Sequence, residues 1–192
     1  MTTEGDRVAQ IQAAWQRERP DLDVSPQAVI ARLHRVALEL TERLTVVYAE
    51  HGLTEGDFDV LATLRRTGEP YERLAGELAD HTLVTTGGLT KRVDRLIGRG
   101  LVERRAEASD ARRRLIRLTP EGKRVIDRAF AAHMANERRL LDDLGPADAA
   151  AIEPILTRWL ALLENGEQSR DQENAPTSGR SRAIRPDHGT RP

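Results

Sequence analysis

Apolar side chains recur every three or four residues along most of the chain, which is the spacing of an amphipathic helix. The first such stretch covers residues 8–15 and is expected to end before Pro20, because proline disfavours helix in the residue that precedes it. The next begins at Ser25, a good N-cap, has Pro26 in its first turn and breaks at Gly52.

Shorter helices follow in the middle of the chain. The pattern predicts one over residues 54–66, a second around Leu74 and Leu78, and a third over residues 85–99 with Thr85 as its N-cap. The period then changes from helical to alternating. Two short strands are expected at residues 101–105 and 114–118, around a polar loop.

Helical spacing returns at Thr119-Pro120 and continues to about Asp143, and Gly145-Pro146 then starts a last helix with a wide apolar face. From Asn165 onward the composition is Gly, Ser, Pro, Gln, Arg and Asp. Such a segment cannot bury enough apolar surface to offset its ordering entropy, so residues 165–192 are expected to be disordered.

Two short helices joined by a turn and followed by a hairpin are typical of a winged helix-turn-helix. The expected fold is therefore mainly α with a small β-hairpin wing. In domain terms, residues 1–24 form an extra N-terminal helix and connection, residues 53–118 the DNA-binding winged helix, and residues 25–52 and 119–164 the dimerisation helices, followed by the tail.

Composition supports a helical protein of 192 residues, with 39% hydrophobic but only 3% aromatic residues. Without cysteine there is no disulfide, thiol nucleophile or thiolate zinc site. No apolar run approaches the roughly 20 residues that span a bilayer, and the polar N-terminus does not resemble a secretory signal. We expect a soluble cytoplasmic protein without membrane contact, metal or cofactor.

The net charge of −1 conceals a strong asymmetry. Between Thr82 and Thr119 ten basic residues face four acidic ones, which gives +6 and leaves −7 for the remainder. A local basic patch of this kind is the electrostatic footprint of a nucleic-acid-binding surface. The partner expected from it is double-stranded DNA.

The helix predicted over residues 85–99 has an apolar side and a polar side. Its polar side and N-terminal end offer hydroxyl groups and cations, which contact base edges and phosphates in a major groove. An ordinary solvent-exposed helix is the alternative, and the arginine-rich hairpin loop beside it favours DNA. The candidate DNA-binding residues are Thr85, Thr86, Thr90, Lys91, Arg95, Arg112 and Arg113.

Three segments together resemble the MarR family of bacterial transcriptional regulators. They are Gly-Leu-Val-Glu-Arg at 100–104, Asp-Ala-Arg at 110–112 and Leu-Thr-Pro-Glu-Gly at 118–122. The resemblance implies a homodimer with interlocked terminal helices that binds a pseudo-palindromic operator, acting as a repressor. It also implies that Arg112 enters the minor groove and that Asp110 orients the wing.

The N-terminal helix is similar to that of the urate-responsive branch of this family. The residues that match that branch are Trp15, Asp59, Arg92 and Arg104. The resemblance implies a small anionic aromatic ligand, such as urate or a related purine or phenolic acid, that weakens DNA binding. The alternative is structural: Trp15 is a hydrophobic staple, and Asp59 forms an ion pair with Arg92 or Arg104.

The sequence does not support an enzymatic function, because the histidines are scattered and no nucleophile, metal-binding or phosphate-binding motif is present. The stronger rival is a DNA-binding protein that is constitutive or controlled by a protein partner, without a small-molecule site. A ligand titration distinguishes the two.

Overall fold

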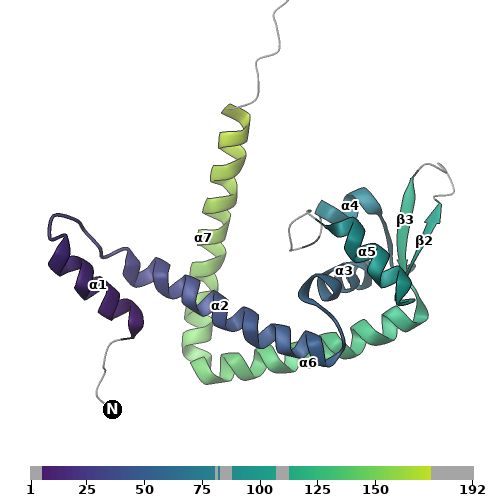
Figure 1. Ribbon diagram of the computed structural model, residues 1–192, viewed down its shortest axis with the longest axis horizontal. Coiled ribbons are helices and arrows are strands. Elements are labelled where there is room, and N and C mark those ends of the chain that lie inside the picture. The colour runs from purple at the N-terminus through teal and green to yellow at the C-terminus, as the bar shows by residue number, and fades with distance from the viewer. Residues whose placement is uncertain (1–5, 81, 83–87, 107–112, 174–192) are drawn as a thin grey trace, which may run out of the picture. The chain divides into compact units, whose positions relative to one another are not determined.

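The computed structural model describes residues 6–80, 82, 88–106 and 113–173 (Figure 1). The fold is mainly helical with a three-stranded antiparallel sheet, as expected for a winged helix. The elements in chain order are α1 (Arg7–Glu18), α2 (Gln27–Glu50), α3 (Glu55–Arg66), β1 (Glu72–Leu74), α4 (Ala75–Asp80), α5 (Leu89–Gly98), β2 (Val102–Ala106), β3 (Arg114–Leu118), α6 (Pro120–Leu144) and α7 (Pro146–Glu173).

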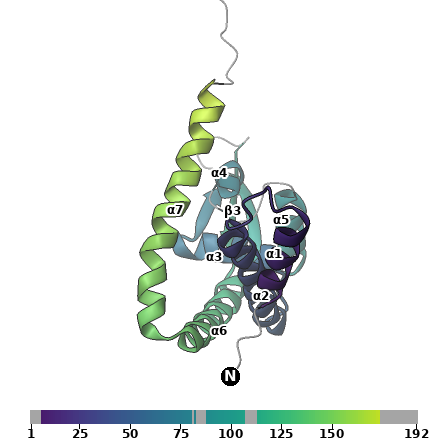
Figure 2. The ribbon, with the colours of Figure 1, turned by 90° about the vertical axis from the view of Figure 1, so that its left-hand side faces the viewer.

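Helix α1 folds back against α2 (Figure 2). Asp6 caps α1 by accepting a hydrogen bond from the Ala9 amide at 2.9 Å, and the same carboxylate pairs with Arg32 of α2 at 2.6 Å. The prediction that Ser25 caps α2 is wrong by one residue: Pro26 is the N-cap. Ser25 instead donates from its amide and hydroxyl groups to Asp23.

The core of the winged-helix part lies between α3, α4, α5 and the sheet. Thr54 and Asp57 close both hydrogen bonds of a capping box at the start of α3, which confirms the predicted helix start. Most of α3 is buried. The apolar core side chains with no exposed surface are Val60, Leu61, Leu64, Leu78, Leu96, Ile116, Ile126 and Ala129.

The sheet has the order β1-β3-β2, so the wing holds one strand more than the predicted hairpin. The predicted pairing of the two later strands is confirmed, with Val102 opposite Leu118. Leu74, expected in a helix, lies in β1 opposite Leu115, and α4 begins only at Ala75. The misassigned strand is three residues long, too short to show an alternating pattern.

Helix α5 begins at Leu89, later than the start predicted after Thr85. Gly88 precedes it with φ of 104°, a left-handed conformation that glycine adopts without strain and that interrupts helical geometry. Thr85 lies outside the described residues. The helix ends at Gly98, as its sequence predicts, and Gly100 follows with φ of 68°.

The start of α6 touches the start of β2. Thr119 caps α6 by accepting from the Gly122 amide at 2.9 Å, and its own hydroxyl donates to the Gly100 carbonyl at 2.7 Å. A Cβ atom on Gly122 would lie 1.8 Å from the Leu101 carbonyl oxygen, so only glycine fits there. These contacts join the third segment of the predicted motif set, 118–122, to the first, 100–104; the second segment, 110–112, lies outside the described residues.

Aromatic rings connect α2, α3 and the middle of α6. Tyr48 stacks on Phe58 with ring centroids 4.3 Å apart, and Phe130 and the buried His133 lie beside Phe58. The Tyr48 hydroxyl lies 3.4 Å from Nδ1 of His133. Burial raises the pKa of Tyr48 to about 12, so this hydroxyl stays protonated and can donate a hydrogen bond.

The chain divides into two compact units, residues 1–140 and 141–192. The second contains α7, whose large aliphatic side chains are exposed, among them Leu160, Leu162 and Leu163. The expected disordered segment begins at Asn165, but α7 continues to Glu173, so that boundary is wrong. Residues 174–192 lie outside the described part of the chain.

Candidate nucleic-acid interface

Helix α5 has one buried side and one exposed side. Val93 and Leu96 are buried against the core, whereas Thr90 and Lys91 are exposed. The helix packs on both α3 and β2, which fixes the direction in which its exposed side faces. The structure therefore places Thr90 and Lys91 on the polar surface expected for them.

The wing adds a second basic surface beside α5. Four exposed arginines lie on β2 and β3 or directly before β3: Arg104, Arg105, Arg113 and Arg114. Arg113, a candidate DNA-binding residue, lies 4.0 Å from the Glu77 carboxylate. Thr85, Thr86, Asp110 and Arg112, also named from sequence, lie outside the described residues.

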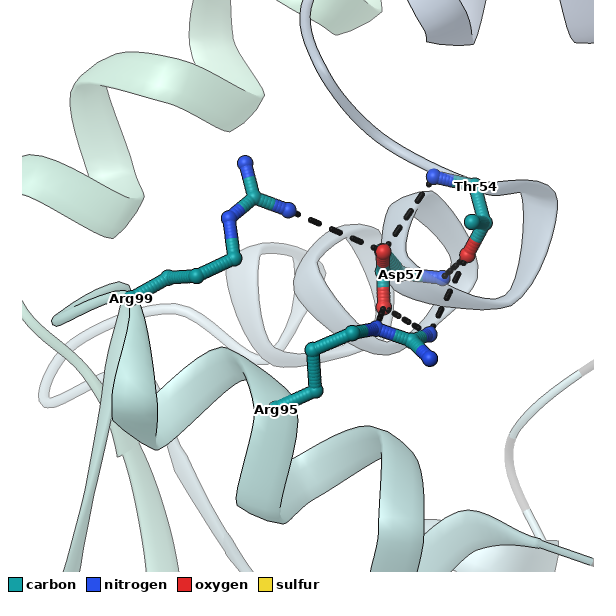
Figure 3. Close-up of polar contacts among 4 residues, drawn as sticks. All are labelled: Thr54, Asp57, Arg95 and Arg99. Atoms are coloured by element: carbon teal, nitrogen blue, oxygen red, sulfur yellow. Dashed lines mark hydrogen bonds and ion pairs between the residues drawn. The ribbon is translucent and has the colours of Figure 1, made fainter.

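Arg95 is turned toward α3 (Figure 3). Its Nη2 lies 2.6 Å and its Nε 3.2 Å from Oδ1 of Asp57, and Arg99 approaches the other oxygen at 3.7 Å. The Asp57 side chain is only 1% exposed. A buried carboxylate requires cationic or hydrogen-bonding partners, and here Arg95 of α5 and Arg99, the C-cap of α5, supply them.

The sequence analysis did not single out Asp57. Its local signal was present, because Thr54 followed by an acidic residue three positions later is the pattern of a capping box. That pattern explains the hydrogen bond from the Thr54 amide but does not indicate which cations come from another helix. The pairing with Arg95 spans 38 positions and becomes visible only in the fold.

The four candidate ligand-binding residues occupy four different elements. Asp59 is buried in α3, and Arg92 is half-buried on α5, which packs against α3. A Cβ on Gly56 would lie 2.6 Å from Nε of Arg92, so the Arg92 side chain lies directly against the α3 backbone. Asp59 and Arg92 are thus on facing helices.

The other two candidates are placed differently. Arg104 on β2 pairs with Asp94 of α5 at 2.9 Å, a partner that the sequence analysis did not propose. Trp15 lies on α1, with 49% of its surface exposed. No hydrogen bond, ring contact or cation–π pair within the described residues joins its indole to Asp59, Arg92 or Arg104.

Known proteins with related sequences identify the chain's family. A family model described as MarR family matches residues 51–113, which include α3, β1, α4, α5 and β2. The HTH-type transcriptional regulator PecS of Dickeya dadantii is 36% identical over 158 residues, which cover 82% of this chain and 95% of PecS. The chain belongs to the MarR family. It is a PecS-like DNA-binding transcriptional regulator and not an enzyme.

Solved MarR-family structures have the same fold. AbsC, a MarR family transcriptional regulator from Streptomyces coelicolor, matches with a TM-score of 0.66 at 26% identity, covering 75% of this chain and 97% of AbsC. A MarR variant from E. coli complexed with operator DNA matches with a TM-score of 0.61 at 25% identity, covering 72% of this chain and 99% of that one.

Within the described ranges, no group of three or more histidine, aspartate or glutamate side chains is arranged to hold a metal ion. No helix in the described part of this MarR-family chain is both long and apolar enough to cross a membrane.

Proposed function

We propose that the chain acts as a homodimeric repressor that binds a pseudo-palindromic operator through α5 and the wing. The observation that supports this most directly is the two-sided arrangement of α5. Its apolar side is buried in the core, while Thr90 and Lys91 are exposed next to the arginines of β2 and β3. Hydroxyl groups and cations on a rigid exposed helix match base edges and phosphates of a major groove.

Relatives support the same interface. The E. coli MarR variant of the same fold was crystallised with operator DNA. The resemblance assigns Arg112 to the minor groove and Asp110 to the orientation of the wing. Thr85 and Thr86, which precede α5 in the sequence, remain DNA-binding candidates from the sequence. Two-fold symmetry of a dimer would require two half-sites about 10 base pairs apart, or a multiple of that spacing.

Exposed apolar surface supports the homodimer. Leu160, Leu162 and Leu163 of α7 are exposed in the described part of the chain, and so are Val29 and Val36 of α2. Clusters of exposed aliphatic side chains on one helix mark interaction sites on a protein that otherwise exposes polar groups. A second copy of the same chain offers the same surface and would bury both.

A salt titration of DNA binding tests the interface. The probe is a duplex selected by the wild-type protein from a random-sequence pool. If Lys91 contacts a phosphate, Lys91→Ala weakens binding and lowers the slope of log K against log salt by about one. The control is Lys123→Ala, which removes the chain's other lysine, whose ammonium group lies over the Tyr71 ring. Equal behaviour of the two variants would exclude Lys91 from the interface.

We also propose that a small anionic aromatic ligand weakens DNA binding. Its support is the buried Asp59 on α3 and the half-buried Arg92 on α5, two helices that pack together, with Trp15 and Arg104 at positions matching the urate-responsive branch. An anion bound by Arg92 would engage a side chain that lies against the α3 backbone and would displace α5 relative to α3.

The rival is a MarR-family protein without a small-molecule site, constitutive or controlled by a protein partner. A titration with urate, xanthine and small phenolic acids separates the two, with melting temperature and binding to the selected duplex as readouts. A ligand of this class raises the melting temperature by mass action and weakens DNA binding. If all of them leave both quantities unchanged, the ligand proposal fails while the DNA-binding proposal stands.

A further inference from the structure

Helix α5, the proposed DNA-reading helix, carries two kinds of basic side chain, which differ in what they contact. The Lys91 side chain is exposed. Arg95, one turn further along the same helix, uses both Nε and Nη2 to bind Oδ1 of Asp57, and Nη2 lies 3.3 Å from the Thr54 hydroxyl as well. Although 46% of the Arg95 side chain is exposed, its Nε and Nη2 groups thus contact Asp57 and Thr54 at the start of α3 (Figure 3).

The burial of Asp57 favours its contact with Arg95. The Asp57 carboxylate is almost wholly buried and accepts from the Thr54 amide at 3.2 Å, but that neutral contact does not balance its charge. The Arg95 guanidinium at 2.6 Å does so, and Arg99 at 3.7 Å is the more distant second cation. If Arg95 turned to a phosphate, the buried charge of Asp57 would lose its nearest cation, which is unfavourable for a carboxylate shielded from water.

The contact between Arg95 and Asp57 restricts the position of α5 on α3. Asp57 lies in the capping box of α3, so its position is fixed by hydrogen bonds in both directions with Thr54. Charge-assisted hydrogen bonds are short and directional, and two of them from one guanidinium restrict how α5 can slide or rotate on α3. The apolar contacts of Val93 and Leu96 are less directional.

We infer that Arg95 is a positioning residue that holds the reading helix on α3 through Asp57 and makes no contact with DNA phosphate. The inference rests on the proposed function in so far as α5 is the reading helix. It differs from the expectation that Arg95 is one of the DNA-contacting residues.

The salt dependence of binding to the selected duplex tests the inference. Arg95→Ala is expected to weaken binding about tenfold, since the helix is less well oriented, with an unchanged salt slope. Lys91→Ala, which removes the exposed cation one turn earlier, is expected to lower the slope by about one. A drop in slope for Arg95→Ala equal to that of a phosphate contact would overturn the inference. No change in slope or affinity for Lys91→Ala would instead contradict the proposed interface.

A double-mutant cycle provides the second readout and does not depend on Lys91. Asp57→Asn keeps the shape of the side chain and can still accept from the Thr54 amide, but it removes the charge that Arg95 balances. In that background Arg95→Ala is expected to cost much less DNA affinity than it does in the wild type. Equal costs in both backgrounds would show that Arg95 acts independently of Asp57 and would refute the inference.

Folding must be monitored in both experiments. Helical circular dichroism and the melting transition show whether each variant is folded at the assay temperature. Arg99→Ala is the matched control, because it removes the more distant cation from the same carboxylate and leaves the short contacts of Arg95 intact. It is expected to reduce affinity less than Arg95→Ala, and a larger loss would contradict the assignment of Arg95 as the main anchor.

Discussion

The winged-helix part and α7 differ in how far their apolar side chains are exposed. In the first, Leu61 and Leu96 have no exposed surface and lie in one continuous core. In α7, Leu160, Leu162 and Leu163 are 57%, 66% and 58% exposed. The first region closes its own core within one chain. In the second, these core-type side chains are exposed in the described part of the chain, so its stability is expected to depend on a second surface.

The largest expected effect is in the closed core. Leu61→Ala removes a fully buried side chain and leaves a cavity, and should lower the free energy of unfolding by about 2–5 kcal/mol. The comparison variant is Leu162→Ala on α7, measured at protein concentrations at which the proposed dimer is dissociated, so that the side chain is exposed and the same change should cost under about 0.5 kcal/mol. Denaturant titrations of both variants measure this difference. Equal losses would mean that the two regions are packed alike.

The next effect concerns the uncovered helix. Leu160→Glu places a charge in the apolar surface of α7 and should raise the dissociation constant of the proposed dimer by at least about a hundredfold. Sedimentation over a range of protein concentrations gives that constant. Glu164→Gln, a polar exchange on the same helix, serves as the control. If Leu160→Glu stays as dimeric as the control, this surface is not the dimer interface.

A smaller effect is expected where the winged-helix part meets α6. Gly122→Ala drives a methyl group into the Leu101 carbonyl, and the backbone shift required should cost roughly 1–3 kcal/mol of stability. Gly98→Ala is the matched control, since a Cβ there meets no atom within 4 Å and its backbone φ is not in the left-handed region. That control should be neutral or slightly stabilising, because alanine favours helix. Thermal unfolding that ranks the two variants in the reverse order would refute this reading of the junction.

The smallest expected effect on stability is at Gly56. Its Cβ would displace the outer part of the Arg92 side chain, from Cδ to Cζ, so Gly56→Ala should change stability by less than about 1 kcal/mol. Response to an anionic ligand should nevertheless be weakened, because Arg92 is moved. Gly76→Ala, where a Cβ has open space, is the control in a ligand titration. An unchanged response in Gly56→Ala would remove Arg92 from the proposed site.

Local signals predicted most of the helices. Thr54 and Thr119 cap helices as their sequences indicate, because a capping hydrogen bond depends only on neighbouring residues. The end of α7 was not predicted, because the polar composition from Asn165 onward indicates disorder; in the structure the helix continues through Gly166. A glycine inside a helix costs only about 1 kcal/mol, which the helical residues around it can offset.

Features that depend on distant residues could not be predicted in the same way. The strand β1 exists because β3 pairs with it, and three residues alone carry no pattern of alternation. Among the candidate site residues, the side on which Thr90 and Lys91 lie follows from the spacing of apolar residues in α5. The partners of Arg95 and Arg104 do not, because spacing along one helix cannot reveal which acidic residue of another element lies opposite.

The contact between α6 and the start of β2 has a mechanical consequence. Thr119 donates from its hydroxyl to the Gly100 carbonyl and from its amide to the Leu101 carbonyl, and Gly122 leaves no room for a Cβ beside Leu101. The start of α6 and the start of β2 are therefore expected to move together. A shift of α6 is therefore transmitted directly to the strand that carries the wing. In the proposed dimer, the distance between the two wings would then depend on the distance between the two α6 helices.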